Sequence, residues 1–558
     1  MRTRARIIKF LDEISSKPIL RYGVYVSAIL FFLIIILVPP ILGIALKLNL
    51  FTDVVNNPSL RARALNAIFL SFVVAIFVSI IDLAAGIPAA WLIARGKSRW
   101  LNVVDTLADL PFIIPTVALG YSLLLFWNST YGLSGIFGNS LISPGWLLVI
   151  LLHFVFSFPI VVRLMVGALL DYQYIYEEAA RTLGASPVAA ERTVTFPILK
   201  PSLIGAFVLA FARSISETGA TIIVAGTFEN GAVFIATMNT PANLAQYGQG
   251  PLVFASLMLI LIAVVIFAII QVLGPRMKIP IQRVFPSFEK ALSGGKVASL
   301  RNGGTLFTLF FIILIPALFV IVSAFPALAD GTLNNALAGN GVFWQQYWPS
   351  LVLSYFIGFI ATLVNIVVGL PMAILIARRR MGKTVSAVFD VLVNIPIIVP
   401  SVALGFSLGL FWRGLPLTIP ELLLIIFAHI SITYPYFVKS LAAAIIRVDL
   451  EIENAARILG ARPFAVFRTI ILPLVKYSFF AGAIIMFTRS VSETGATVAV
   501  SVSLKTVPVL LVGYIKSLIT AKGVGMSSDV GLGCGFLILF SIIILLALRF
   551  VIRGRGRY

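Results

Sequence analysis

The segment Glu177–Leu199 reads EEAARTLGASPVAAERTVTFPIL, and the segment Glu453–Val475, which lies 276 positions later, reads ENAARILGARPFAVFRTIILPLV. The two segments are identical at 12 of their 23 positions, and each lies between long apolar runs. A polar segment that recurs inside a hydrophobic chain is expected to be exposed to water and to have a function. Both segments are therefore predicted to be docking surfaces for another protein.

Other landmarks repeat at the same spacing. Phe211–Thr221 (FARSISETGAT) matches Phe487–Thr497 (FTRSVSETGAT) at nine of eleven positions, and the only two histidines of the chain are also 276 residues apart. Upstream, Pro111–Gly120 (PFIIPTVALG) matches Pro396–Gly405 (PIIVPSVALG) with an offset of 285 residues. The chain is therefore predicted to be a tandem duplication of one structural unit.

Composition indicates that the surrounding solvent is lipid. Hydrophobic residues make up 60% of the chain, charged residues make up 11%, and the mean hydropathy is +1.06, which is outside the range of soluble domains. A helix needs about 20 apolar residues to cross a bilayer. The sequence predicts an all-α integral membrane protein with about 12 transmembrane helices, from apolar runs near 22–47, 66–94, 102–127, 145–170, 198–226, 251–274, 303–325, 350–377, 386–412, 420–443, 474–502 and 530–552.

The repeat divides the chain into three parts. Residues 1–274 and 303–558 are expected to form the two repeats, and residues 275–302, with six basic residues, are expected to form a cytoplasmic linker. The docking loops cover about 174–197 and about 450–473. The first apolar run is interpreted as a retained helix and not as a secretory signal, because it ends in Pro-Pro rather than in a small-residue cleavage pattern.

Basic residues predict the orientation. If the amino terminus is cytoplasmic, the predicted inside segments hold 31 of the 42 Lys and Arg residues, as the positive-inside rule requires. Six crossings per half then place both termini and both docking loops in the cytoplasm and make the halves parallel repeats. The net charge of +21 is explained by this topology and by contact with anionic membrane lipid. A nucleic-acid partner is not expected, because the charges are dispersed among membrane loops.

The first docking loop has the pattern of a helix–turn–helix. Glu177, Ala179 and Ala180 lie in a short helical stretch that reaches Gly184, whose backbone freedom permits a sharp turn. A second amphipathic stretch ends at Pro197. An interfacial helix resting on lipid headgroups is the alternative, but such a helix does not require the same Glu, Ala-Ala, Gly and Pro spacing twice.

The pattern E-x-A-A-R-x-L-G, followed by a proline before the next apolar run, resembles the EAA loop of permease subunits of binding-protein-dependent ABC importers, which have the type I importer fold. In that family the loop is a coupling helix that inserts into a groove of a cytoplasmic ATPase. Two permease units would be fused here, and Asn454 departs from the first copy, which has Glu178. Carried over by position, the resemblance implies that the ATPase contacts are Glu177, Ala179, Ala180, Gly184, Glu453, Ala455, Ala456 and Gly460.

The resemblance also implies partners and excludes catalysis by this chain. The chain has no G-x-x-x-x-G-K-[ST] phosphate loop, so it is not expected to be an enzyme or to hold a cofactor. ATP and Mg²⁺ would be bound by a separate ATPase homodimer. An extracellular or periplasmic solute-binding protein would deliver the solute, with contacts from segments near 227–250 and 503–529. The expected mechanism is alternating access in the plasma membrane.

The fifth apolar run of each half carries charges. Arg213 with Glu217, and Arg489 with Glu493, are spaced four residues apart in apolar surroundings. Ionisable groups at membrane depth usually face a pathway, although a pair that only locks helix packing remains an alternative. The predicted substrate pathway comprises Arg213, Ser214, Ser216, Glu217, Thr218, Arg489, Ser490, Ser492, Glu493 and Thr494.

Prolines and histidines mark the third and fourth runs. The first proline of each pair, Pro111 and Pro396, can occupy an opening turn, whereas Pro115 and Pro400 are expected to kink the third helices. The two histidines, at positions 153 and 429, are expected to be neutral and hydrogen-bonded to a neighbouring helix, because no second ligand accompanies either one. No metal site is predicted, and the lone cysteine at position 534 excludes a cysteine cluster.

Only the resemblance to branches of the permease family indicates which class of substrate is transported. The sequence S-E-T-G-A-T resembles the molybdate, tungstate and sulfate permeases, which favours an inorganic oxyanion. Fusion of two units is instead familiar from the iron(III) and thiamine branches of the same fold, so these substrates remain the alternative. A twelve-helix secondary transporter driven by an ion gradient is the rival class, because it also has two parallel six-helix halves.

Overall fold

The computed structural model describes residues 10, 12–13, 15–96, 98–276 and 286–553, and every regular element in these ranges is a helix. The predicted linker is described only in part, because residues 277–285 lie outside these ranges, as do the chain ends at 1–9 and 554–558. The all-α membrane architecture predicted from composition is confirmed.

We refer to α2–α17 as the first half and to α19–α34 as the second half. The first half consists of α2 (Pro18–Phe31), η1 (Phe32–Leu37), α3 (Val38–Ala45), η2 (Leu48–Leu50), α4 (Phe51–Val55), α5 (Pro58–Arg95), α6 (Leu101–Leu107), α7 (Leu110–Ile113), α8 (Thr116–Asn128), α9 (Leu133–Phe137), α10 (Trp146–Asp171), α11 (Ile175–Thr182), α12 (Pro187–Ala190), η3 (Glu191–Thr195), α13 (Phe196–Ser216), α14 (Gly219–Val224), α15 (Gly231–Met238), α16 (Pro241–Tyr247) and α17 (Gly250–Leu273).

After η4 (Gly274–Arg276) and α18 (Pro286–Leu292), the second half repeats this plan. It consists of α19 (Gly295–Phe307), η5 (Thr308–Leu314), α20 (Ile315–Leu318), α21 (Val320–Ala324), α22 (Pro326–Ala329), α23 (Thr332–Ala338), α24 (Val342–Ala377), α25 (Lys383–Leu392), α26 (Ile395–Ile398), α27 (Ser401–Gly414), α28 (Glu421–Ile446), α29 (Leu450–Ile458), α30 (Pro463–Val466), η6 (Phe467–Ile471), α31 (Leu472–Val491), α32 (Gly495–Val500), α33 (Val507–Lys522) and α34 (Ser528–Arg553).

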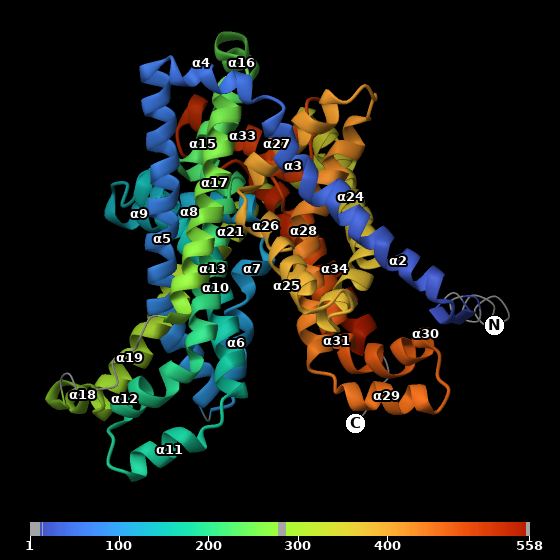
Figure 1. Cartoon of the computed structure of the whole chain (residues 1–558). Coiled ribbons are helices and arrows are strands. Elements are labelled where there is room, and N and C mark those ends of the chain that lie inside the picture. Colours follow the sequence, from blue (N-terminus) through green and yellow to red (C-terminus); the bar gives the residue numbers. More distant parts are fainter. Residues whose placement is uncertain (1–9, 11, 14, 97, 277–285, 554–558) are drawn as a thin grey trace.

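Within the described ranges, nine helices are long and apolar enough to cross a membrane. The number is eleven if each of two sharply bent helix pairs is one span. The last predicted run, 530–552, falls in α34, which has a shorter apolar stretch at Ser528–Ile544. Figure 1 shows α11 and α29 at one end of the molecule and α4 and α16 at the opposite end.

The predicted bend at the second proline of the runs 102–127 and 386–412 is confirmed, but the helix is interrupted there and not merely kinked. Each run is a pair of helices bent by 104°. Pro111 lies in the first turn of α7, as predicted, but Pro115 directly precedes α8 and Ile114 is extended, with ψ of 127°. A proline disfavours helical geometry in the residue before it and has no N–H to donate. The helix therefore ends, and Pro400 has the same place before α27.

The fifth runs, 198–226 and 474–502, are also interrupted where single helices were expected. α13 ends at Ser216 and α14 begins at Gly219, and in the second half α31 ends at Val491 and α32 begins at Gly495. Glu217 is extended, with φ of −80° and ψ of 125°. The charged pair of each half therefore bridges a helix end and does not lie along one continuous helix face.

The two halves exchange their first spans. α2 packs against α24 and α3 against α27, whereas α19 packs against α5 and α20 and α21 pack against α8. Ser122 of α8 donates a hydrogen bond to the Pro316 carbonyl and accepts one from the Val320 amide, both at 2.7 Å. A Cβ on Gly43 would lie 1.8 Å from the Ser407 carbonyl oxygen, so α3 and α27 touch through their backbones. The halves are interlocked.

Candidate functional site

The repeated polar segments form the predicted helix–turn–helix. We call α11 and α29 the docking helices. Gly184 has φ of +90° and Gly460 has φ of +85°, a region that favours glycine. At the end of α11 the Ala185 amide bonds to the Ala180 carbonyl and the Gly184 amide to the Arg181 carbonyl, which is the Schellman arrangement. The same two bonds close α29, so both helices end by the same mechanism.

The glutamates of the docking helices point inward. Glu177 is fully buried and Glu453 is 1% exposed. Glu177 pairs with Arg181 at 2.5 Å and accepts a hydrogen bond from Thr195 at 3.3 Å. Both side chains were expected to contact a partner protein. The structure places them instead between the docking helices and the membrane-spanning part, where a carboxylate must be paired to be buried.

The outer face of the docking helices combines small and large apolar residues with polar ones such as Glu178 and Asn454. Ala179 and Ala455 are exposed and Ala180 and Ala456 are partly exposed. Next to them, Leu183 is 88% exposed, Ile458 is 85% exposed and Leu459 is 87% exposed. Sequence reasoning missed these three side chains. For Leu183 and Leu459 a signal was available, because each is a large apolar residue directly before a turn glycine in an otherwise polar loop.

Each docking helix is tied to the end of a long membrane helix by an arginine. In the second half, Arg378, which follows α24, pairs with Glu453 at 2.5 Å and donates to the Val448 carbonyl at 2.9 Å. In the first half, Arg95 at the end of α5 lies 4.2 Å from the ring centroid of Tyr174. A buried ion pair in the second half and a cation–π contact in the first half thus each join a docking helix to a membrane helix.

The predicted pathway residues meet at the breaks of the fifth spans. We call Ser216–Thr218 and Ser492–Thr494 the central turns. A Cβ on Gly219 would lie 2.5 Å from the Thr494 side chain, and a Cβ on Gly495 would lie 2.7 Å from the Thr218 hydroxyl. The two central turns therefore touch each other across the boundary between the halves. Glycine is required because the approach leaves no room for a side chain.

The glutamate of each central turn forms a buried ion pair with an arginine of the preceding helix. Arg213 pairs with Glu217 at 3.0 Å, and Arg489 pairs with Glu493 at 2.5 Å. The other carboxylate oxygen of Glu217 accepts the Ala220 amide at 3.3 Å, which satisfies a free N–H of the following short helix. All four charged side chains are at most 10% exposed. In this conformation the pairs fasten a helix break.

The third spans hold the central turns of the opposite half. Ser401, directly after Pro400, donates a hydrogen bond to the Ser216 carbonyl at 3.0 Å. Thr116, directly after Pro115, reaches the Ser492 carbonyl at 3.5 Å. The sharp bends of the third spans thus bring two hydroxyl groups to the freed carbonyls of the fifth spans. Broken backbone inside a membrane protein needs such partners.

The histidines bond to neighbouring helices, as predicted. His153 contacts the hydroxyl of Ser214 at 2.8 Å through Nδ1 and that of Thr221 at 2.9 Å through Nε2. His429 makes the same contacts with Ser490 at 2.7 Å and Thr497 at 2.9 Å. Each ring spans both sides of a central turn and fixes the two pieces of the fifth span to the fourth.

The hydroxyl groups of the central turns are mostly occupied. Ser214 and Ser490 bond to the histidines, and Ser216 and Ser492 bond to carbonyls of their own helices. The Thr218 hydroxyl is buried without a hydrogen-bond partner. The two central turns are in closed contact, with one unsatisfied hydroxyl group at the centre. Because most of the hydroxyl groups are already hydrogen-bonded, the arrangement is more typical of a closed gate than of an open binding site.

Comparison with known proteins places these features in a family. The family model described as the inner membrane component of binding-protein-dependent transport systems matches residues 86–279 and again residues 369–555. Each match contains one docking helix and one central turn. The duplication seen in the sequence is therefore a duplication of this family's unit.

Individual relatives match about one unit each. The sulfate transport system permease protein CysT of Salmonella typhimurium is 33% identical over 208 residues, which are 35% of this chain and 72% of that protein. The molybdenum transport system permease protein ModB of Escherichia coli K12 is 36% identical over 163 residues, which are 28% of this chain and 69% of that protein.

Proposed function

Because the chain belongs to the family of inner membrane components of binding-protein-dependent transport systems, we propose that it imports an inorganic oxyanion such as molybdate, tungstate or sulfate. The chain is a multi-pass permease subunit of an ABC importer and is not itself catalytic. The named functions of its relatives, sulfate and molybdenum transport, support the oxyanion. The docking helices, present twice, are the observation on which the coupling mechanism rests.

The docking helices contact a cytoplasmic ATPase homodimer, which binds ATP and Mg²⁺. Two equivalent subunits of a homodimer need two similar docking surfaces on one chain, and α11 and α29 supply them. The exposed Leu183, Ile458 and Leu459 fill grooves of the ATPase, and the alanines permit close approach. Glu177 and Glu453 act from inside: Glu177 accepts a hydrogen bond from Thr195, before α13, and Glu453 pairs with Arg378, after α24.

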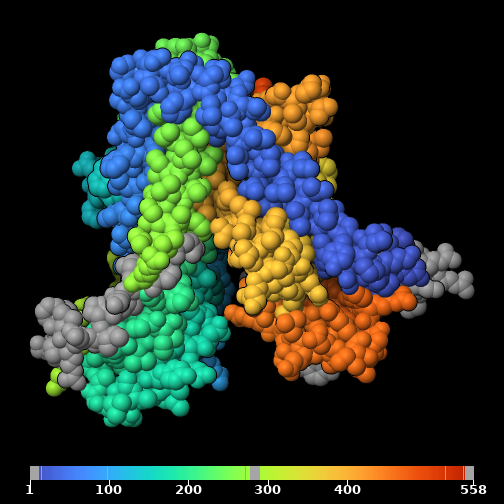
Figure 2. All heavy atoms as spheres, in the orientation of Figure 1, coloured from blue at the N-terminus to red at the C-terminus, as the bar shows by residue number. Residues whose placement is uncertain are grey.

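This assignment places α11, α29 and both termini on the cytoplasmic side. The opposite end, with α4 and α16, then faces the solute-binding protein. Figure 2 shows the docking end divided into two lobes with a hollow between them. Closure of the ATPase brings the docking helices together and rocks the lobes, and the central turns separate to admit the solute by alternating access.

The partner assignment is tested by affinity purification of the chain from its native cells in a mild detergent. The variant Gly184→Pro with Gly460→Pro is compared with the wild type, because proline cannot adopt the positive φ at these positions. An ATPase subunit that co-purifies with the wild type and is lost from the variant supports the proposal. If no ATPase is recovered with either while transport persists, the ATPase-coupled mechanism is wrong.

The substrate is tested separately by uptake into cells that express the chain with its co-purified partners. Labelled sulfate and molybdate are offered with an excess of tungstate, iron(III) or thiamine as competitor. Accumulation of either oxyanion, reduced by tungstate only, supports the oxyanion. Labelled iron(III) and labelled thiamine are offered in parallel. Uptake of either one without uptake of an oxyanion contradicts the oxyanion and leaves the permease assignment intact.

A further inference from the structure

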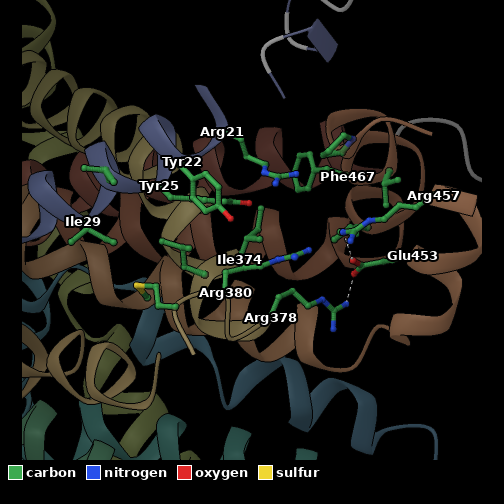
Figure 3. A pocket seen from close by; sticks show the side chains of 16 residues that line it. Arg21, Tyr22, Tyr25, Ile29, Ile374, Arg378, Arg380, Glu453, Arg457 and Phe467 are labelled. Carbon is green, nitrogen blue, oxygen red and sulfur yellow. Dashed lines mark hydrogen bonds and ion pairs between the residues drawn. The ribbon is translucent and has the colours of Figure 1, made fainter. Parts of the chain in front are cut away.

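A basic cavity lies beside the second docking helix. Its volume is about 290 Å³, and its walls come from α2, the end of α24, α29, α30 and η6. Figure 3 shows Arg21, Tyr22 and Tyr25 on one side and Glu453 and Arg457 on another. The cavity therefore joins the first span of one half to the docking helix of the other.

The charge in this cavity is unbalanced. Four arginines line it, Arg21, Arg378, Arg380 and Arg457, against one carboxylate, Glu453. Arg378 and Arg457 both pair with Glu453, at 2.5 Å and 3.5 Å. The Arg378 side chain is 5% exposed, and its Nε has no hydrogen-bond partner. A net positive cavity with a buried, unsatisfied guanidinium N–H is suited to a small anion with several oxygens.

The mouth of the cavity continues into an apolar strip. Along α2, Ile19 is 86% exposed, Tyr22 is 60% exposed, Val26 is 51% exposed and Leu30 is 49% exposed. Spacings of three and four residues put these side chains on one helix face. In a chain that spans the membrane, such a face contacts acyl chains, and Tyr22, one turn from its start, suits the headgroup level.

We propose that this cavity binds the phosphate headgroup of an anionic phospholipid, with its acyl chains along the exposed face of α2. The arginines hold the phosphate oxygens and the aromatic side chains pack against the glycerol. Basic pockets between membrane helices recognise lipid headgroups by this chemistry. The bound lipid would contact α29 through Arg457, at the point where α29 is fastened to α24.

The first half differs at the equivalent place. Arg95, the counterpart of Arg378, stacks on Tyr174, and the second half has Leu450 where the first has Tyr174. The ring that covers Arg95 is therefore missing beside Arg378, whose Nε has no hydrogen-bond partner. The proposed site lies beside α29 of the second half, with α2 as its opposite wall.

Native mass spectrometry of the purified full chain tests the proposal, with phosphatidylglycerol or phosphatidylcholine added to the detergent. The variant Arg21→Gln with Arg380→Gln removes two cavity charges and leaves both partners of Glu453 in place. The matched control is Arg379→Gln with Arg462→Gln, since both arginines are exposed and outside the cavity. Arg21→Gln alone is measured as well, in case the double variant does not fold.

We expect the wild type to retain phosphatidylglycerol over phosphatidylcholine. The cavity variant should lose at least tenfold in that preference, because each basic group near the surface contributes a factor of about five. The single variant should lose about half of this effect on a logarithmic scale. The control should keep the preference. Equal loss in the control, or retention of both lipids alike, overturns the proposal. If inorganic phosphate alone displaces the lipid at equal concentration, the site is one for a free anion and the lipid assignment is wrong.

Discussion

Two residue types hold the candidate sites in shape, glycine at the turns and paired charges at the helix ends. Gly184 and Gly460 have open space around the position of a Cβ, so their requirement is conformational and not steric. The carboxylates of Glu217 and Glu453, in contrast, are buried, and each is held in place by an ion pair with an arginine. A substitution at either kind of position is therefore expected to lower the stability of the protein or its docking by a predictable amount.

Replacement of the turn glycines is expected to weaken docking. In Gly184→Ala with Gly460→Ala, each alanine is forced to positive φ at a cost of roughly 1–2 kcal/mol, which frays the ends of α11 and α29. The amount of co-purified ATPase should fall several-fold. Gly304→Ala is the control, because Gly304 lies inside α19 with open space around it and alanine there should stabilise by about 0.5–1 kcal/mol.

The central ion pair is expected to behave as a unit. Glu217→Gln leaves Arg213 buried without its counter-charge and should destabilise the protein by about 3–5 kcal/mol, whereas Arg213→Met with Glu217→Gln should cost clearly less than the sum of the single changes. SDS-induced unfolding of the purified chain measures the two single variants, Glu217→Gln and Arg213→Met, and the double variant. Additive costs would show that the pair does not lock the helix break and would favour a pathway role for the charges.

At the scale of helices, breaks in one half are completed by the other half. Ser122 of α8 satisfies the backbone between α20 and α21, and Ser401 of α27 satisfies the end of α13. Inside a membrane each freed N–H or carbonyl needs a partner, so a broken span is stable only where a neighbour supplies one. This dependence couples the movement of the two halves.

The coupling between elements predicts unequal effects at two equivalent serines. Ser122→Ala removes two buried hydrogen bonds between the halves and should destabilise by about 2 kcal/mol. Ser407, its counterpart, bonds only to carbonyls of its own helix, so Ser407→Ala should cost less than about 1 kcal/mol. Both are read from the SDS midpoint. Equal losses would mean that the exchanged first spans do not contribute to stability through Ser122.

At the scale of the whole molecule, the halves meet again near the docking end. Asp171 at the end of α10 pairs with Arg447 after α28 at 3.4 Å, and the two positions are equivalent in the repeat. Both side chains are more than 60% exposed, so the pair adds at most about 1 kcal/mol. The pair instead identifies this conformation, in which the ends of α10 and α28 lie close together. The docking helices α11 and α29 lie apart (Figure 1).

This arrangement predicts a pattern of cross-linking. Asp171→Cys with Arg447→Cys should be joined by a short bifunctional maleimide, whereas Leu183→Cys with Leu459→Cys, at the tips of the docking helices, should not. The only native cysteine, Cys534, is buried, so the background is low. Addition of the ATPase and a non-hydrolysed ATP analogue should bring the second pair within reach. Cross-linking of the second pair in the chain alone would contradict the separated arrangement.

The sequence alone determined the duplication, the all-α membrane class, the family and the helix–turn–helix of the docking loops, because each follows from local composition, spacing or a turn glycine. It also anticipated that each histidine bonds to a neighbouring helix. It could not show the breaks of the third and fifth spans, the inward direction of Glu177 and Glu453, or the exchange of the first spans. Those depend on contacts between residues far apart in the chain. Only the tertiary structure brings the carbonyl freed at Ser216 to the hydroxyl of Ser401, and without that partner a continuous helix would be the favoured state in lipid.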